Sequence, residues 1–231
     1  MSADAEPSPA LRRIASVHTG YHEKFAVPRQ PGLAPSAWGR LEFEPDYRHP
    51  DAVRGLDGFS HLWLIFGFHH IDPEKWSPTV RPPRLGGNQR VGVFASRSTH
   101  RPNGLGLSLV QLTHVDLTSP NAPVLHLAGV DLVDGTPIYD IKPYLPYAEA
   151  IPDATAGYAP TEPEKLHVTG EQHLRDMPDP DRRLVLESLA LDPRPATHQA
   201  PREYGTTLCH WNIRFRITQN TCEIISAKPL R

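Results

Sequence analysis

The chain has 231 residues, enough for one large domain or for a main domain with a small second one, and 39% of them are hydrophobic. Its formal net charge of -2 excludes coating of a polyanion by the whole surface and leaves nucleic-acid binding to local patches. The 26 prolines are about twice the usual frequency, which excludes a helix bundle and favours turns and extended segments.

Cysteine content and the lengths of apolar segments indicate the cellular compartment. Cys209 and Cys222 are too few for a disulfide framework or a four-cysteine zinc site. They fall on neighbouring predicted strands, so a disulfide is geometrically feasible, but buried thiols of a reduced cytoplasmic protein are the favoured interpretation. The first residues lack the basic start and apolar run of a signal peptide, and no apolar segment reaches membrane-spanning length. We therefore expect a cytoplasmic protein with no membrane partner.

Taken in chain order, short apolar and alternating patterns dominate the first two thirds of the sequence. They predict strands over residues 11–19, 38–45, 59–71, 107–117, 124–133 and 137–144. Residues 20–35 form a long loop with reactive side chains such as Lys24 and Arg29, and long loops in compact domains tend to be functional. Hairpin spacing with few helical periods predicts a mainly β fold, an antiparallel β-barrel.

The remainder predicts a small α+β domain. Apolar residues at helical spacing indicate a helix over 181–191, and alternation indicates strands over 210–218 and 222–227. A preceding segment rich in proline, alanine and threonine is interpreted as a linker. The predicted organisation is a β-barrel domain over 10–150, a linker over 151–165 and a small C-terminal α+β domain over 166–231.

An arginine-rich segment, residues 80–106, is the strongest local signal, and we call it the arginine tract. It contains Arg81, Arg84, Arg90, Arg97 and Arg101, and no Asp or Glu occurs between Glu74 and Asp116. In its middle the apolar run Val91–Ala95 predicts a buried strand with a loop on each side. Guanidinium groups bind phosphate and carboxylate and stack on nucleobases, so the tract predicts a surface for nucleic acid or a nucleotide-like ligand. The alternative is that each arginine is solvated and paired with a distant acid.

Histidines at the end of the 59–71 segment suggest a ligand site. On an extended segment His69 and His70 would point to opposite faces, so one structural and one pocket-lining histidine is favoured and no metal is expected. His61 would share a face with His69. A serine nucleophile such as Ser108 is a further alternative, although no nucleophile-elbow motif surrounds it.

Two carboxylates, Asp131 and Asp134, lie at the end of the predicted strand 124–133, immediately before Gly135. Asp beside Gly is ordinarily turn chemistry. Opposite a cationic pocket, however, a carboxylate would hold an amine or the ribose hydroxyls of a charged ligand. Nucleotide-binding fingerprints are missing from the sequence, because Leu109 stands where a dinucleotide loop would have its third glycine.

Six segments in fixed order carry a family resemblance. They are EKFAVPRQPG (23–32), FSHLWLIFGFH (59–69), RPPRLGG (81–87), VGVFASRSTHRPNGLGLSLV (91–110), DLVDGTPIYDIKPYLPYAE (131–149) and DPRPA (192–196). They resemble the TsaA-like family, specifically the bacterial TrmO tRNA methyltransferases. The resemblance implies a β-barrel enzyme that binds S-adenosyl-L-methionine and methylates N6 of threonylcarbamoyladenosine, position 37 beside the anticodon of threonine tRNA. Gly104 departs from the proline often found in relatives, and residues 156–181 have no match.

By motif, the resemblance also implies the cofactor-binding positions. They are Pro28, Arg29, Gln30, His69, His70, Arg97, Leu107, Asp131, Leu132, Val133 and Asp134. We expect the arginine loops, the 28–30 turn and the strand end at Asp134 to converge on one cavity. No catalytic residue is assigned, because a carboxylate, a histidine or water can accept the proton that leaves N6.

The expected partners are the tRNA anticodon loop and, by resemblance, a second copy of the chain in a homodimer. Unstacked loop bases need no extraction from a duplex, and basic side chains steer the phosphates. The hypothesised phosphate contacts are Lys24, Arg84, Arg90, Arg101 and Lys142. The alternatives are a non-catalytic β-barrel module that binds S-adenosylmethionine or RNA, and a hydrolase that uses a serine and a histidine near Arg97.

Overall fold

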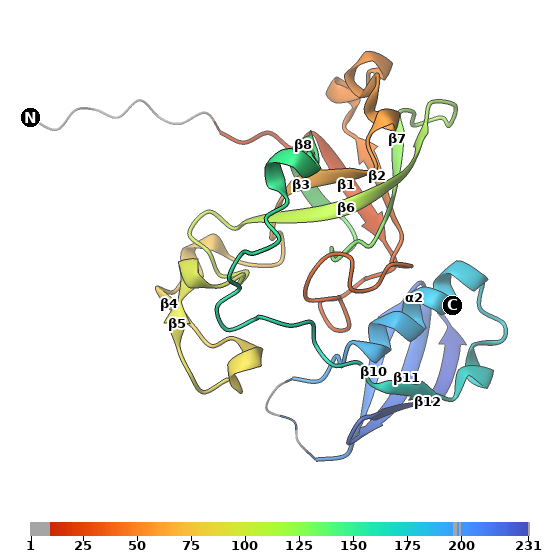
Figure 1. Cartoon of the computed structure of the whole chain (residues 1–231). Helices are drawn as coiled ribbons and strands as arrows, with labels where there is room; N and C mark the ends of the chain where they lie inside the picture. Colours follow the sequence, from red (N-terminus) through yellow and green to blue (C-terminus); the bar gives the residue numbers. More distant parts are fainter. Residues whose placement is uncertain (1–9, 196–197, 199, 231) are drawn as a thin grey trace, which may run out of the picture.

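The computed structural model describes residues 10–195, 198 and 200–230 (Figure 1). The expectation that no signal peptide begins the chain concerns residues 1–9, which lie outside the described residues. No helix in the described part of the chain is both long and apolar enough to cross a membrane. The fold is mainly β, as predicted, with short helical segments between the strands.

A closed barrel forms the first half of the molecule. Its strands are β1 (Ala15–Thr19), β2 (Gly39–Phe43), β3 (His61–Gly67), β6 (Leu105–Asp116), β7 (Val124–Ala128) and β8 (Thr136–Pro143). They close in the order β1-β2-β7-β6-β3-β8, and every neighbouring pair is antiparallel (Figure 1). The predicted antiparallel barrel is therefore confirmed.

Alternation of side chains explains why these segments form barrel strands. In β3, Leu62, Leu64 and Phe66 are buried, while the residues between them are partly exposed. In β1, Ala15 and Val17 point inward in the same way. These side chains belong to one apolar cluster inside the barrel, and burying a large one stabilises the fold by about 1.5–3 kcal/mol.

Helical segments are short and lie mostly in connections. They are the 3-10 helices Pro45–Tyr47, Pro50–Val53, Leu56–Gly58, Pro73–Lys75, Pro83–Leu85, Val93–Ala95 and Glu171–Leu174, together with α1 (Pro146–Glu149) and α2 (Asp179–Ala190). The predicted helix at 181–191 corresponds to α2.

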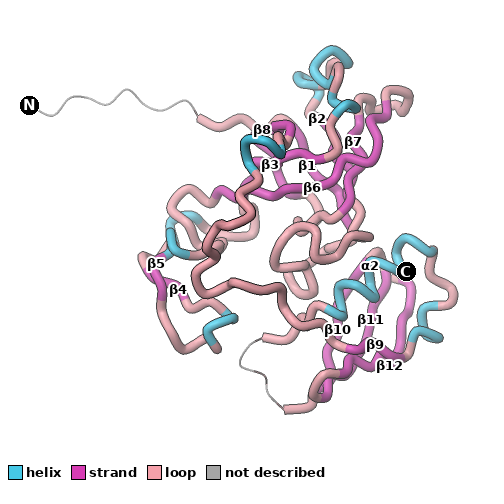
Figure 2. The backbone as a smooth tube through the Cα atoms, viewed as in Figure 1, coloured by secondary structure: helices cyan, strands magenta, loops and turns pink. Residues whose placement is uncertain are grey.

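The predicted buried strand over Val91–Ala95 is wrong. Strand β5 (Val91–Gly92) pairs with β4 (Thr79–Val80), and Val93–Ala95 continue as a 3-10 turn in which Phe94 is 75% exposed. The β4–β5 ribbon lies away from the barrel (Figure 2), and of the apolar run only Val93 is buried. The arginine tract is therefore a surface ribbon with loops, not a barrel strand.

The C-terminal sheet consists of β10 (Arg202–Leu208), β11 (Trp211–Thr218), β12 (Thr221–Pro229) and β9 (His167–Thr169), in that order. Helix α2 packs on it through Leu184 and Leu189. The sequence missed β9, which has three residues, and β10, which contains few apolar side chains. Cys209 and Cys222 are free and buried, as the favoured interpretation predicts for the thiols, and burial raises the pKa of both.

Candidate functional site

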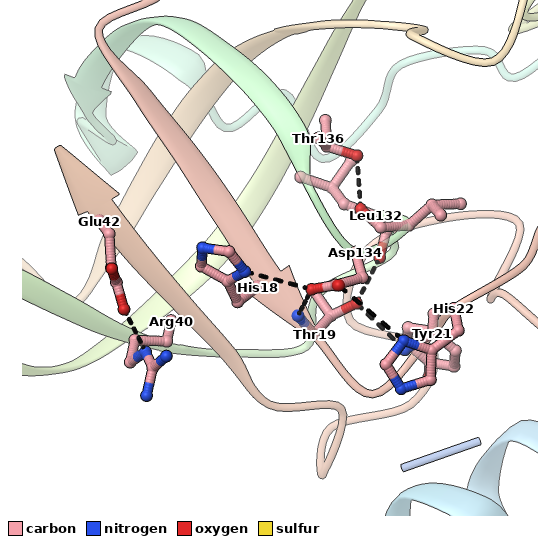
Figure 3. A network of polar contacts seen from close by, with 10 residues as sticks. His18, Thr19, Tyr21, His22, Arg40, Glu42, Leu132, Asp134 and Thr136 are labelled. Atoms are coloured by element: carbon pink, nitrogen blue, oxygen red, sulfur yellow. Dashed lines mark hydrogen bonds and ion pairs between the residues drawn. The ribbon is translucent and has the colours of Figure 1, made fainter. Parts of the chain in front are cut away.

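Asp134 lies at the centre of a polar network where β1 ends and the chain enters β8 (Figure 3). Its Oδ1 accepts a hydrogen bond from the Thr19 N–H at 3.0 Å, and its own N–H donates to the Tyr21 carbonyl at 2.7 Å. Thr19 Oγ1 donates to the Leu132 carbonyl at 3.0 Å and accepts from the Tyr21 N–H at 3.1 Å. Segments 115 residues apart are therefore held in one geometry at the end of the barrel.

Histidines surround the Asp134 carboxylate. His18 Nδ1 lies 3.4 Å from Oδ1, and His22 Nδ1 lies 3.9 Å from Oδ2 (Figure 3). The His22 ring packs against that of His210, with ring centroids 4.6 Å apart. Its Nε2 is buried without a hydrogen-bond partner in the described part of the chain. The carboxylate thus sits among groups that can donate hydrogen bonds to it.

His69 faces the same aspartate from the turn after β3. Burial lowers the pKa of His69, the charges of His70 and Lys24 act in the same direction, and Asp134 opposes them. Lys24 Nζ donates to the His70 carbonyl at 3.1 Å. Lys24, which the sequence placed with the RNA contacts, therefore lies beside residues placed with the cofactor.

Asp131 joins the cluster from the same connection between β7 and β8. Ser108 Oγ on β6 donates to Asp131 Oδ1 at 2.5 Å. Loss of solvation raises the pKa of Asp131 to about 6, whereas the Ser108 hydrogen bond and the charge of Arg97 act against this rise. Arg97 of the arginine tract therefore lies close enough to interact with this carboxylate.

The turn at residues 28–30 belongs to the long segment between β1 and β2. Pro28 is buried, and the exposed Arg29 donates from Nη2 to the Arg194 carbonyl at 3.3 Å. Further along, the Gly32 N–H donates to the Gly129 carbonyl at 2.9 Å. A side chain at Gly129, whose φ is +69°, would meet Gly32 Cα at 3.3 Å, so this approach favours glycine.

The remaining cofactor positions contribute differently. Leu107 on β6 points outward beside Ile65 and is 48% exposed. Leu132 points into the barrel core, and its carbonyl accepts the Thr19 hydroxyl. The Val133 carbonyl accepts a hydrogen bond from Thr136 Oγ1 at 2.6 Å. The Leu132 and Val133 carbonyls therefore help fix the turn that carries Asp131 and Asp134.

The basic residues predicted to contact tRNA are spread over several elements. Arg84 donates to the Thr161 carbonyl at 2.6 Å and Arg90 to Thr79 Oγ1 at 3.0 Å, and both are exposed. Lys142 is exposed on β8. These exposed groups remain accessible to a polyanion.

Arg101 is used differently from the other arginines. Its Nη1 donates to the carbonyls of Val93 at 3.2 Å and Ser96 at 2.8 Å, and its guanidinium lies over the Phe94 ring. It therefore holds the fold of the tract.

The contacts bring Lys24, His69, His70, Arg97, Asp131 and Asp134 together at one end of the barrel. Two hollows of the described surface involve neighbouring parts of the chain, one beside Ser98 next to Arg97 and the other at Lys24. One, of about 380 Å³, is lined by Ser77, Thr79, Val80, Arg81, Arg90, Ser98 and His100. The other, of about 210 Å³, separates Lys24 and Arg29 from the Asp192–Pro195 loop. Asp131 and Asp134 line neither hollow, and Arg29 and the tract arginines line different ones, so neither hollow is the single cavity that the sequence predicts.

Two sequence-based statements about histidines are wrong. His69 and His70 lie in a turn, not on an extended strand, and their ring centroids are 4.0 Å apart. His61 lies at the other end of β3, where its Nδ1 is 2.9 Å from Ser60 Oγ, so it does not share a site with His69. Within the described residues, no group of three or more His, Cys, Asp or Glu side chains is arranged to hold a metal ion.

Sequence reasoning also missed His18, His22 and Ser108 as members of this cluster; Ser108 entered only as a nucleophile. In β1, side chains alternate between the two faces, and Val17 points inward, so the sequence already placed His18 on the outer face of the strand. Ser108 is a buried polar residue on an otherwise apolar strand face, which is a comparable signal. His22 lies beyond the strand, where no pattern reports its direction.

Fold and site together define a class: a closed β-barrel with a small α+β domain and an acid, histidine and arginine cluster at one barrel end. Residues 16–150 match the family model described as the tRNA-methyltransferase O N-terminal domain, and residues 163–230 match the TrmO C-terminal domain. The chain belongs to the tRNA-methyltransferase O (TrmO) family.

Similar proteins cover nearly the whole chain. The Escherichia coli protein named tRNA (adenine(37)-N6)-methyltransferase is 47% identical over 95% of this chain and 97% of its own length. A crystal structure of TrmO from Pseudomonas aeruginosa has a TM-score of 0.78 and 34% identity, covering 96% of this chain and 99% of that chain. A Pyrococcus abyssi relative, named a probable S-adenosyl-L-methionine-binding protein, is 31% identical over 67% of this chain and 78% of its own.

Proposed function

We propose that this protein is an S-adenosylmethionine-dependent tRNA methyltransferase. It methylates N6 of threonylcarbamoyladenosine at position 37, beside the anticodon of threonine tRNA. The observation that carries the proposal is the 47% identity, over 95% of the chain, to a protein named tRNA (adenine(37)-N6)-methyltransferase. The division at residues 151–165 into a barrel domain and a C-terminal domain is part of the same proposal.

The proposed cofactor site is the end of the barrel around Asp131 and Asp134. Carboxylates complement the ammonium group and ribose hydroxyls of S-adenosylmethionine, and Arg97 complements its carboxylate. The buried His22 Nε2, which has no partner among the described residues, is a further polar group for such a ligand. The 28–30 turn, the His69–His70 turn and Leu107 complete the proposed site, and the chemistry of these groups fits the cofactor.

When bound, the cofactor supplies a methyl group on a positively charged sulfur. Transfer of that methyl group to N6 would release the thioether of the cofactor and the N6 proton, which a carboxylate, a histidine or water would accept. The protein's part is to hold N6 in line with the methyl group at about 3 Å, since alignment lowers the barrier most. The reciprocal bonds around Asp134 suit this task because they fix the barrel end before a ligand arrives.

Exposed basic residues are proposed to bind the anticodon loop. Lys24 joins this surface to the cofactor site through its bond to the His70 carbonyl. Arg84 and Arg90 present guanidinium groups from the arginine tract, and Lys142 is a further exposed cation near the far end of β8, opposite Trp63. Arg101 acts mainly through the tract's own fold, as its two carbonyl bonds indicate.

We also propose that the protein is a homodimer that acts in the cytoplasm, where its tRNA substrate is used. Outward apolar side chains support a self-contact: Leu107 is 48% exposed and Phe94 is 75% exposed. Both lie close in the chain to Arg97, so a partner seated there would border the cofactor site. Sedimentation at several concentrations measures the oligomeric state.

Two measurements test the proposed activity. Titration calorimetry detects S-adenosylmethionine binding, and mass analysis of threonine tRNA incubated with protein and cofactor detects transfer. We expect binding and a mass gain of one methyl group on the modified adenosine, with no gain on tRNA that lacks the threonylcarbamoyl group. Binding without transfer would instead support the non-catalytic module. The absence of both binding and transfer would favour the hydrolase.

A further inference from the structure

The segment between β1 and β2, residues 20–38, contains the proposed cofactor turn but packs mainly with the C-terminal domain; we call it the cofactor loop. Its buried residues Tyr21, Ala26, Ala34 and Ala37 belong to the apolar cluster of α2 and the C-terminal sheet. Figure 1 shows this loop between the barrel and α2. The second domain therefore completes its core with a piece of the first.

Aromatic stacking reinforces this packing. The Phe25 ring stacks on Tyr204 and Phe215, with centroids 6.0 and 6.3 Å apart. Tyr21 forms an isolated β-bridge with Leu208, and its hydroxyl lies 2.9 Å from Ser188 Oγ on α2 in a buried contact. Three residues before the cofactor turn, the chain is thus already fixed to the C-terminal sheet.

Polar side chains of the C-terminal domain hold both ends of the loop. Near its start, Glu23 Oε1 accepts hydrogen bonds from Thr206 Oγ1 and the Thr207 N–H, both at 2.9 Å. Near its end, the Glu187 carboxylate on α2 accepts the N–H and the hydroxyl of Ser36, at 2.7 and 2.8 Å.

A third polar contact closes the loop where it enters β2. Trp38 Nε1 donates to Asp181 Oδ1 at 3.0 Å. Glu187 and Asp181 both lie on α2, which also contributes Ser188 to the Tyr21 contact. One helix therefore contacts the loop before and after the proposed cofactor turn.

We propose that α2 holds the cofactor loop in its binding conformation, with Glu187 and Asp181 as positioning residues for the cofactor. The inference rests on the proposed function, because it takes the 28–30 turn as a cofactor contact. A segment with few backbone hydrogen bonds loses conformational freedom when it binds a ligand. Anchors on a folded domain order the segment before binding, so less conformational entropy is lost when the ligand binds. The C-terminal domain thereby acts on cofactor affinity, whatever it contributes to RNA binding.

Glu187→Ala in the full-length chain tests the inference most directly. It removes both bonds to Ser36, so we expect the Kd for S-adenosylmethionine, measured by calorimetry, to rise about tenfold, the usual size for a charged hydrogen bond. At saturating cofactor, kcat and the KM for tRNA should stay within about twofold, because the residue touches neither substrate. Glu187→Gln, which keeps an acceptor for the Ser36 N–H, should restore part of the affinity.

Matched variants separate positioning from general damage. Arg183→Ala changes an exposed residue of the same helix and should leave the cofactor Kd unchanged. Ser36→Ala removes one of the two bonds and should raise the Kd about threefold. If Glu187→Ala fails to fold, the cofactor Kd of Ser36→Ala still tests the inference. In the double variant, Ser36→Ala should add nothing to Glu187→Ala, since both remove the same contact.

Each result has a distinct meaning. Unchanged cofactor affinity in folded Glu187→Ala and Ser36→Ala would overturn the inference, as would a rise confined to the KM for tRNA. A wild-type chain that binds no S-adenosylmethionine would instead remove the proposed function itself.

Discussion

Asp134 and Arg90 carry opposite charges in opposite kinds of setting. The Asp134 carboxylate accepts a backbone hydrogen bond from β1 and lies near two histidines, all contributed by a distant part of the chain. Arg90 lies exposed on a loop beside a two-residue strand, with one bond to Thr79 nearby in the sequence. The barrel end is thus preorganised, whereas the arginine tract keeps its charges accessible.

This difference matches two kinds of ligand. A small cofactor that must be aligned for transfer gains from fixed partners, because each ordered group lowers the cost of binding. A polyanion gains from mobile, solvated charges, because its affinity comes largely from counterion release. The following substitutions should therefore act on different measured quantities in the two regions.

Asp134→Asn should have the largest effect. The amide oxygen still accepts the Thr19 N–H, so the fold is retained, but the negative charge is lost. We expect kcat/KM for S-adenosylmethionine to fall on the order of a hundredfold, the upper size of a charge-assisted hydrogen bond at this partly exposed carboxylate. Asp57→Asn, at an exposed carboxylate, is the matched control. Activity within a few-fold of wild type would show that Asp134 only shapes the turn.

Lowering the pH should change cofactor affinity by an intermediate amount. The pKa of Asp131 is raised to about 6, so its carboxylate is ionised at pH 7 and mostly protonated at pH 5. If the ionised form holds the cofactor, affinity falls as the pH drops through 6, by about tenfold between pH 7 and pH 5. Calorimetry at both pH values measures this change.

Asp131→Asn provides the control for that profile. The variant should bind weakly at both pH values and lose the Asp131 contribution to the pH dependence. An unchanged profile would assign the titration to another group, such as a histidine near Asp134.

The arginine tract should give the smallest effect, seen mainly in salt dependence. Replacing Arg84 and Arg90 together by alanine should weaken tRNA binding about fivefold at moderate salt. The slope of log K against log salt should fall by about 1.4, about 0.7 per lost phosphate contact on single-stranded RNA, with cofactor affinity unchanged. Filter binding at several salt concentrations measures both quantities.

Arg101→Ala is the matched comparison within the tract. Because Arg101 already donates to the Val93 and Ser96 carbonyls, we expect less than about a twofold change in tRNA affinity and a lower melting temperature. A large change in salt slope for this variant, or none for the double variant, would reverse the assignment of the arginines.

The strands illustrate how far the sequence alone could lead. Alternation in β1, β2, β3 and β8 is visible in the residues and tells which side chains face inward, because successive strand residues point to opposite faces. It does not tell which strands pair. The closing contact between β1 and β8, Ala15 with Ile138, joins segments that no local pattern relates.

The arginine tract shows the opposite case. Its composition predicts an anion-binding surface. The sequence alone, however, does not distinguish the exposed Arg90 from Arg101, whose guanidinium bonds to backbone carbonyls. The apolar run Val91–Ala95 satisfies the pattern of a buried strand, but of its side chains only Val93 is buried, and Phe94 is 75% exposed. Burial depends on the other elements available, and this information is distributed over the whole chain.

By itself the sequence determined the mainly β class, the helix in the C-terminal domain, the absence of a net basic charge and the ordered motifs of the TrmO family. These features follow from local spacing and residue type. Only the tertiary structure decided that the cofactor loop packs with the C-terminal domain, that His69 and His70 share a turn, and that Asp134 joins β1 to β8. Each of these depends on which distant donors and apolar surfaces come together, because hydrogen bonds and buried contacts are satisfied in space and not along the chain.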